Sequence, residues 1–323
     1  MLYLSWDDIM NVLTFDEVMD RVEEALRIYE TREFVMPDRL TVDCGDNNSL
    51  LLMPCVSHGN IATKVLTLFP ENRARNRPVI DAVVILNDHS TGEILSLMDG
   101  KAITAMRTGA VTGVSIRHLA RRDAQSVGLV GCGAQGYYQV VYACAARNIR
   151  QITLFDIAPE VVAPLIQRLK ATLSGVDMEG AESAEELARA SDIIITATTA
   201  RQPVFPNVPE LFMGKHCIAI GSFQPDVREY PDAIFSLVEK VWIDTDFASE
   251  ESGELLIPLR EGNLKKEQLE TLGHFIQSGN EPQRGAYGTT FSKAVGMALF
   301  DLTTAELAYV NASRLGLGTA IGD

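Results

Sequence analysis

The chain has 323 residues, of which 46% are hydrophobic and 22% charged, and its formal net charge is −15. At roughly 100–200 residues per domain this length predicts about two domains, and the composition is that of a globular protein with room for a sizeable core. The acidic balance excludes the basic face that a phosphate backbone requires, so we expect no nucleic-acid partner.

The first third of the chain predicts helices followed by a sheet. Residues 6–33 carry apolar side chains at helical spacing and predict a short and a long amphipathic helix, with Thr14 as the N-cap of the second. Between about 38 and 98, short β-rich runs are separated by Asp, Asn, Gly and Pro, and residues 88–93 (DHSTGE) carry a hairpin-turn signal. This pattern indicates an antiparallel, meander-like sheet.

The rest of the chain alternates helices and strands. After a helix with small residues on one face at 101–122, strands are predicted at 126–130, 151–156, 192–199, 216–223 and 240–245, and helices at 136–148, 158–173 and 183–191. The tail, 292–316, predicts one long helical stretch that packs back against the first domain. The alternation is typical of a doubly wound parallel sheet. We therefore predict an α/β protein with an α+β domain, 1–120 completed by about 300–323, and a Rossmann-type domain, 121–299.

The strongest local signal is the glycine-rich turn GCGAQG at 131–136, which follows an apolar strand and opens a helix. Gly131 permits the tight turn, Gly133 lets backbone N–H groups approach a pyrophosphate, and the helix N-terminus adds a partial positive charge. Asp156, at the end of the next strand, is placed to bind an adenosine ribose and to repel a 2′-phosphate. We predict an NAD(H) site, with NADP(H) as the alternative cofactor; a glycine turn that binds something else is the structural alternative.

Three cations of the first domain suit the chemistry of amino or imino acids. Lys64 lies in the middle of the apolar strand IATKVLTLF, where a lysine needs an anion or a cavity. Arg39 stands at the start of the sheet, and Arg107 lies within the small-residue helix. An arginine fork on a carboxylate and a lysine beside the reacting nitrogen would serve such substrates. Taken singly, a residue of this kind is more often an ordinary surface or ion-pair residue than a substrate ligand.

The cysteines and the apolar runs point to a cytoplasmic protein. The five cysteines are scattered and show no zinc spacing, so we expect reduced thiols and no metal. The first residues, MLYLSWDDIM, start acidic, unlike a secretory leader. No apolar run reaches the roughly 18 residues that span a bilayer, so we expect no membrane contact.

A set of short motifs resembles the ornithine cyclodeaminase/mu-crystallin family. The matches run in order along nearly the whole chain: Met36-Pro37, Met53-Pro54, Lys64, Pro70, Asn72, Thr91-Gly92, Thr104, Arg107-Thr108, Gly131 to Gln135, Lys293, Gly296 to Ala298 and Asp301. The resemblance implies a homodimer formed through the N-terminal sheet domain, with NAD(P) in the Rossmann domain. It also implies a small imino- or amino-acid substrate.

The resemblance assigns roles to individual residues. Arg39, Lys64 and Arg107 would hold the substrate's carboxylate and its imine or amine, with Lys64 and Arg107 as the catalytic pair. The cofactor would be held by Thr108, Gly131, Gly133, Ala134, Gln135, Asp156, Thr196, Thr198, Ser222 and Lys293.

One position departs from the cyclodeaminase pattern. Cyclodeaminases and the related alanine dehydrogenase carry an aspartate where this chain has Phe223. A phenylalanine cannot do acid–base work, and the surrounding Gly-Ser-x-x-Pro-Asp-x-Arg-Glu form is similar to the ketimine and pyrroline-2-carboxylate reductase branch.

We therefore expect an NAD(P)H-dependent oxidoreductase that reduces a cyclic ketimine carboxylate, either pyrroline-2-carboxylate or piperideine-2-carboxylate. The protein would place the substrate while the cofactor supplies hydride. The alternatives are an ornithine cyclodeaminase, an alanine or opine-type amino-acid dehydrogenase, and a crystallin-like ligand-binding protein.

Overall fold

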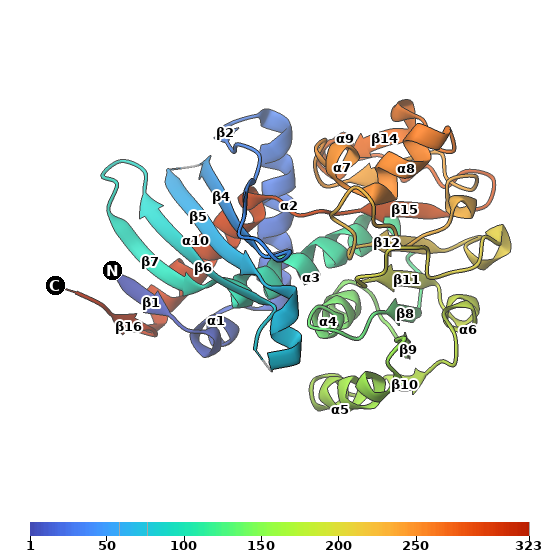
Figure 1. Ribbon diagram of the computed structural model, residues 1–323, viewed down its shortest axis with the longest axis horizontal. Coiled ribbons are helices and arrows are strands. Elements are labelled where there is room, and N and C mark those ends of the chain that lie inside the picture. The colour runs from blue at the N-terminus through green and yellow to red at the C-terminus, as the bar shows by residue number, and fades with distance from the viewer. Residues whose placement is uncertain (58, 76, 323) are drawn as a thin grey trace. The chain divides into compact units, whose positions relative to one another are not determined.

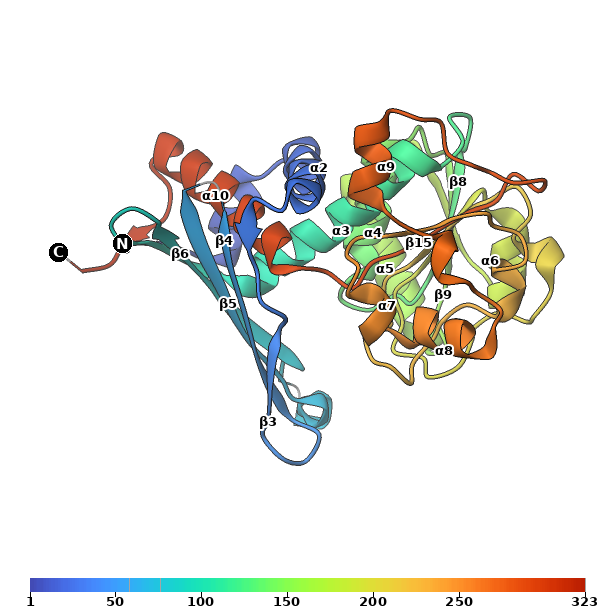
Figure 2. The ribbon, with the colours of Figure 1, turned by 90° about the horizontal axis from the view of Figure 1, so that it is seen from above.

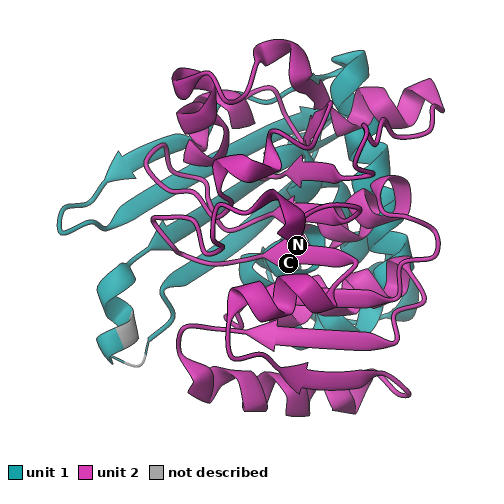
Figure 3. Cartoon of the chain, turned by 90° about the vertical axis from the view of Figure 1, so that its right-hand side faces the viewer, with its two compact units in different colours: residues 1–107, 297–323 teal, residues 108–296 magenta. Residues whose placement is uncertain are grey.

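The computed structural model describes residues 1–57, 59–75 and 77–322 and divides into two compact units. Unit 1 consists of Met1–Arg107 with Met297–Asp323, and unit 2 of Thr108–Gly296 (Figure 3). The predicted domains, 1–120 with about 300–323 and 121–299, join the same segments but place the first boundary at 120 rather than 107. That division stays a proposal.

Unit 1 is a sheet with helices on one face (Figures 1 and 2). Its elements are β1 (Leu2–Leu4), α1 (Trp6–Val12), α2 (Phe15–Thr31), β2 (Phe34–Val35), β3 (Leu40–Asp43), β4 (Ser49–Ser57), β5 (Asn60–Leu68), the 3-10 helix Pro70–Arg75, β6 (Ile80–Asp88), β7 (Ile94–Asp99), α10 (Ala298–Leu315) and β16 (Thr319–Ala320). The strand order is β16-β1-β7-β6-β5-β4-β2, with β3 also paired to β4. The run from β4 to β7 is antiparallel, as predicted, whereas β1 pairs with β7 in parallel.

The two N-terminal helices begin where the sequence predicts. Ser5 and Thr14 are their N-caps, and each forms a capping box with the acidic residue three positions on. Such a cap contributes about 1 kcal/mol to the free energy of unfolding. Helix α10 contacts α2 and also packs against β4, β5 and β6, so one face of the sheet is buried in unit 1.

Unit 2 is built around a parallel sheet. The helix α3 (Gly100–Leu119) contains the unit boundary and leads into β8 (Ser126–Val130), α4 (Gly136–Ala146), β9 (Gln151–Phe155), α5 (Val162–Thr172), β10 (Asp177–Gly180), α6 (Ala184–Ala190), β11 (Ile193–Thr196), β12 (His216–Ala219), β13 (Val241–Ile243), α7 (Ala248–Glu251), α8 (Gly253–Glu261), β14 (Leu269–Thr271), α9 (Leu272–Ser278) and β15 (Thr290–Lys293). The strand order is β10-β9-β8-β11-β12-β15-β13-β14, and every pair is parallel. The predicted doubly wound α/β class is confirmed.

The tail differs from its prediction. Residues 292 and 293 were expected at the start of a long helix, but Thr290–Lys293 form β15, which lies between β12 and β13. All four residues of β15 are buried, so the strand shows no alternation that could mark it in the sequence. Gly296 then adopts a φ of 81°, and the helix α10 begins only at Ala298.

In the part of the chain that the structure describes, no helix combines the length and apolar character needed to cross a membrane.

Candidate functional site

Lys64 is a buried cation in the middle of a strand. It lies in β5, between Met53 of β4 and Val84 of β6, and its side chain is on the sheet face covered by α10. The residue is 1% exposed, and its Nζ donates a hydrogen bond of 2.7 Å to Oδ2 of Asp301. A buried ammonium group requires such a partner, because its desolvation is otherwise very costly.

Asp301 links Lys64 to Arg107. It lies in the first turn of α10 and is 1% exposed, and its other oxygen, Oδ1, accepts a hydrogen bond of 3.2 Å from Nε of Arg107. One carboxylate thus faces two cations, and the cluster keeps an excess positive charge. A substrate carboxylate is the chemical complement of that excess.

The cluster also shifts the pKa of Lys64. Burial lowers the pKa of Lys64 to about 8, Asp301 opposes that change, and the positive charges of Arg107 and Arg39 lower it further. Lys64 therefore titrates near neutral pH, where an amine can give or take a proton. The structure brings the three predicted substrate residues into one electrostatic group.

Asp301 was not among the predicted site residues, although it is one of the residues that carry the resemblance to the family. Its signal was available: the carboxylate of Asp301 stands directly among apolar residues in MALFDL, at the start of the helix, as Lys64 stands in an apolar strand. Buried charges of opposite sign are expected to pair with each other. The local sequence, however, does not show which of them will meet.

In unit 2, several predicted cofactor residues lie at one edge of the sheet. Thr196 of β11 is in register with Val130 of β8 and Ala219 of β12, and Ala219 is in register with Lys293 of β15. The glycine-rich turn and Asp156 follow β8 and β9 directly at this same carboxyl edge. In parallel α/β sheets this edge is where ligands bind.

The glycine-rich turn has the shape that a pyrophosphate needs. Gly131 has a φ of 102°, and a Cβ there would meet the Ala197 carbonyl oxygen at 2.6 Å. At Gly133 a Cβ would meet nothing within 4 Å, so its α-carbon borders open space. Gln135 is the N-cap of α4 and makes no side-chain cap, which leaves the helix N-terminus to an anion. Ala134 and Gln135 lie in this turn, and their contact with a pyrophosphate stays a prediction.

Asp156 is held in place by two backbone donors. Its Oδ2 accepts a hydrogen bond of 2.7 Å from the Cys132 N–H, and its Oδ1 accepts one from the Ala158 N–H. The carboxylate is therefore fixed beside the glycine turn and keeps further lone pairs for ribose hydroxyls. These features fit a bound dinucleotide.

Buried carboxylates organise the loops that follow β11 and β12. Oε1 of Glu229 accepts hydrogen bonds from the N–H and hydroxyl of Thr198, and Oε2 accepts one from the Gly221 N–H. A Cβ at Gly221 would lie 2.1 Å from the Thr198 carbonyl oxygen, so the two loops can pack this closely only because residue 221 is glycine. Glu229 was not predicted as a site residue.

The remaining predicted cofactor residues differ in how far they are buried. Thr196 is fully buried, and its hydroxyl donates to the Ile218 carbonyl oxygen. Ser222 is also fully buried and donates to Glu254, while Nζ of Lys293 donates to the Ala219 carbonyl oxygen. Thr108, on α3, is partly exposed. Their roles toward a cofactor stay predictions.

Phe223 and Asp226 occupy the loop after β12 where cyclodeaminases carry their acid. The Phe223 side chain is 37% exposed. The Asp226 carboxylate forms an exposed ion pair with Arg201. This loop thus offers an aromatic ring at the key position and a carboxylate that is already paired.

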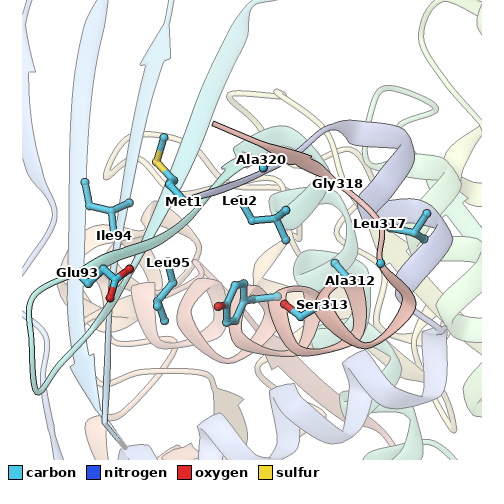
Figure 4. Close-up of a pocket in the computed structure, with 12 residues that line it drawn as sticks. Met1, Leu2, Glu93, Ile94, Leu95, Ala312, Ser313, Leu317, Gly318 and Ala320 are labelled. Carbon is cyan, nitrogen blue, oxygen red and sulfur yellow. The ribbon is translucent and has the colours of Figure 1, made fainter. Parts of the chain in front are cut away.

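Unit 1 also has a hollow of about 410 Å³ formed by β1, β7, β16 and the end of α10 (Figure 4). Among the described residues that line it are Leu2, Ile94, Leu95 and Leu317, with Glu93 as a carboxylate. None of the predicted site residues lines this hollow.

A buried lysine–aspartate–arginine cluster and a Rossmann-type sheet with a glycine-rich turn define an NAD-dependent enzyme of amino- or imino-acid chemistry. The chain belongs to the ornithine cyclodeaminase/mu-crystallin family, which it matches over residues 2–315. This confirms the predicted family.

Relatives match the chain along its whole length. A Δ(1)-pyrroline-2-carboxylate reductase from Bacillus cereus is 31% identical over 328 residues, which cover 99% of each chain. The structure of the Thermococcus litoralis Δ(1)-pyrroline-2-carboxylate reductase in complex with NADH and L-proline is 33% identical. It has a TM-score of 0.93 and covers 99% of this chain and 100% of that one. An archaeal alanine dehydrogenase dimer with bound NAD is 26% identical, with a TM-score of 0.90, and covers 100% and 99%.

Proposed function

We propose that this protein is an NADH-dependent reductase that converts Δ(1)-pyrroline-2-carboxylate to L-proline. The buried Lys64–Asp301–Arg107 cluster carries the proposal, because it offers excess positive charge for a carboxylate and an amine that titrates near neutral pH. The similarity to reductases over the whole chain agrees with it and bears out the predicted NAD-dependent imine reduction.

The reaction adds a hydride to the imine carbon and a proton to the imine nitrogen. NADH, when bound, supplies the hydride. In unit 1, Arg107 pairs with the substrate carboxylate, assisted by Arg39, and so fixes the position of the C=N bond. Nζ of Lys64 donates the proton to the imine nitrogen and regains one from solvent. Asp301 orients Lys64 and Arg107, and it acts as a positioning residue.

Phe223 separates this proposal from the runner-up. A cyclodeaminase must also move protons at the side-chain amine of ornithine, and the acid that does so in that branch is replaced here by Phe223. An alanine or opine-type dehydrogenase stays the second candidate, since the archaeal alanine dehydrogenase matches the whole chain as well.

A panel of substrates tests the proposal. NADH oxidation is followed at 340 nm with pyrroline-2-carboxylate, with piperideine-2-carboxylate, and with pyruvate plus ammonium; ornithine with NAD runs in reverse, with ammonia measured. We expect fast turnover of a cyclic imine and no ammonia from ornithine. Ammonia and proline from ornithine, with no activity on the imines, would overturn the proposal.

The cofactor is NAD(H) rather than NADP(H). Asp156 stands at the ribose position, and its negative charge disfavours a 2′-phosphate. The next residue is Ile157, which cannot pair with a phosphate. A tenfold preference for NADPH in the same assay would contradict this assignment.

We further propose a homodimer formed through the face of the unit 1 sheet that lies opposite α10. On that face, Leu40, Leu52, Val65 and Val83 form a row in register across four strands. Leu40 and Val83 are 56% and 37% exposed. An apolar row of this kind favours burial against another surface.

Because the reaction draws on NADH, we place the protein in the cytoplasm.

A further inference from the structure

Unit 2 has a second cluster of cations, far from the glycine-rich turn. Arg117, His118, Arg122, Arg147 and Arg284 line a pocket of about 220 Å³, which we call the arginine pocket. Four guanidinium groups in one small pocket are unusual in a chain with a net charge of −15.

The arginine pocket lies at the amino edge of the parallel sheet. Arg117 is in the last turn of α3, which leads into the start of β8, and Arg147 follows α4 and precedes β9. The glycine-rich turn follows the other end of β8. At about 3.3 Å per residue, the five-residue strand β8 separates the two places by roughly 15 Å. The pocket is therefore distinct from the proposed cofactor site.

The hydrogen bonds of the fold account for the position of one of these arginines, Arg147. The Arg147 guanidinium donates to the carbonyl oxygens of Arg117, Ala120 and Arg121 at the end of α3. This is the favourable interaction of a cation with a helix C-terminus. Burial lowers the pKa of Arg147, and three nearby guanidinium groups lower it further, those of Arg122, Arg284 and Arg117. These groups therefore lie close enough to repel one another.

No ion pair within the described part of the chain accounts for the position of Arg284. Its side chain is half-buried, and among the described residues no carboxylate lies within ion-pair distance of it. The nearby Glu281 is itself paired, at 3.5 Å, with Arg122 at the exposed rim. Burial and the charge of Arg121 lower the pKa of Arg284, the carboxylates of Glu281 and Asp123 oppose this change, and an oxyanion in the pocket would relieve the remaining repulsion.

We propose that the arginine pocket binds one small oxyanion with two negative charges, of the phosphate or phosphomonoester type. Guanidinium forks match the geometry of phosphate oxygens, and both Arg284 and Arg122 line the pocket. The volume lies below the roughly 300–1,000 Å³ of pockets that hold drug-sized ligands, and it suits a phosphate with a short carbon chain.

Calorimetric titration of the full-length protein with inorganic phosphate tests the proposal. The protein is first saturated with NADH, so that phosphate cannot bind at the glycine-rich turn, and the ionic strength is kept low. We expect one phosphate per chain. The same titration with glycerol phosphate distinguishes a phosphomonoester from free phosphate as the preferred ligand, and succinate reports on dicarboxylates.

Variants of Arg284 locate the binding. Arg284→Gln should weaken phosphate binding about tenfold or more, and Arg284→Lys, which keeps the charge but not the fork, should weaken it less. Arg189→Gln is the matched control, because Arg189 is an exposed arginine of the same unit, paired with Glu185 on α6. It should bind phosphate as the wild type does.

Two results would overturn the proposal: no phosphate binding by the wild-type protein, or wild-type affinity in a folded Arg284 variant. Far-UV circular dichroism reports whether each variant folds. If Arg284→Gln does not fold, Arg284→Lys decides the question.

Discussion

Lys64 is tolerated inside a sheet because a residue 237 positions away provides its counter-charge. Burial favours the neutral amine and the Asp301 carboxylate favours the ammonium, and the balance places the pKa of Lys64 at about 8. An ordinary surface lysine would stay protonated throughout the physiological range. At the scale of single residues, the site is thus a lysine adjusted for proton transfer.

The first prediction removes that amine. Lys64→Met keeps the length of the side chain but has no proton to donate, so the rate of imine reduction should fall by roughly 10²–10⁴-fold. NADH affinity, measured by fluorescence titration, should be unchanged, because the predicted cofactor residues lie in unit 2. The control is Lys170→Met, at an exposed position of α5. An undiminished rate in Lys64→Met would show that the lysine is not the proton donor.

The second prediction concerns the pH dependence of the rate. Reduction needs the protonated amine, so kcat/KM for the imine should decline as pH rises through about 8, and proline oxidation should instead rise there. Asp301 favours the protonated amine, so Asp301→Asn should move the declining limb to lower pH. Glu306→Gln, on the same helix and bonded to Asn60, is the control and should leave the limb in place. A limb that does not move in Asp301→Asn would contradict the positioning role.

The third prediction compares two glycines of one turn. Gly133→Ala meets no atom within 4 Å and needs no unusual φ, so the melting temperature should not change. Its methyl group would occupy the space of the pyrophosphate, and NADH should bind at least tenfold more weakly. Gly131→Ala, with a φ of 102° and a contact at 2.6 Å, should instead destabilise the protein itself. If Gly133→Ala bound NADH as tightly as the wild type, the glycine-rich turn would not be part of the cofactor site.

At the scale of elements, the helix α8 is joined to the loop after β12 through buried acids. Glu254, in the first turn of α8, accepts hydrogen bonds from the N–H groups of Glu229 and Tyr230. Burial, and then the charge of Glu229, raise the pKa of Glu254 to about 7. Between about pH 4.5 and about pH 7, Glu254 therefore keeps a proton in the folded protein that the same residue has lost in the unfolded chain.

The fourth prediction follows from that difference. Because the pKa of Glu254 is raised on folding, its contribution to stability is greatest at low pH and is lost as pH rises from about 4.5 to about 7. Glu254→Gln lacks this titration, so its stability relative to the wild type should improve by on the order of 2 kcal/mol between pH 5 and pH 8. Urea unfolding at the two pH values measures it. A difference between the proteins that does not vary with pH would rule out this titration.

At the scale of the whole molecule, the sheet of unit 1 has two unlike faces. Lys64 and its alternate neighbours in β5 point toward α10, so Val65 and its cross-strand partners point the other way. The proposed dimer would bury that second, apolar face.

The fifth prediction tests the dimer. Light scattering coupled to size-exclusion chromatography should give twice the chain mass of 35.4 kDa for the wild type. Val83→Glu places a charge at the β6 end of the apolar row and should give monomers, because a buried unpaired charge is very costly. Val310→Glu, at an exposed apolar position of α10, should stay dimeric. A wild-type monomer at micromolar concentration would refute the proposed assembly.

Local patterns in the sequence were enough for much of this protein. Capping boxes at Ser5 and Thr14, the β-rich runs and the glycine-rich turn each depend on residues within a few positions of one another, so their structures follow from short-range sterics and hydrogen bonding. Tertiary structure alone decided the rest. It joined Asp301 to Lys64 and to Arg107, which is 194 positions away, and it placed Lys293 on a buried strand. Such pairings arise when distant buried charges must find partners in a packed core, and no local pattern records which ones will meet.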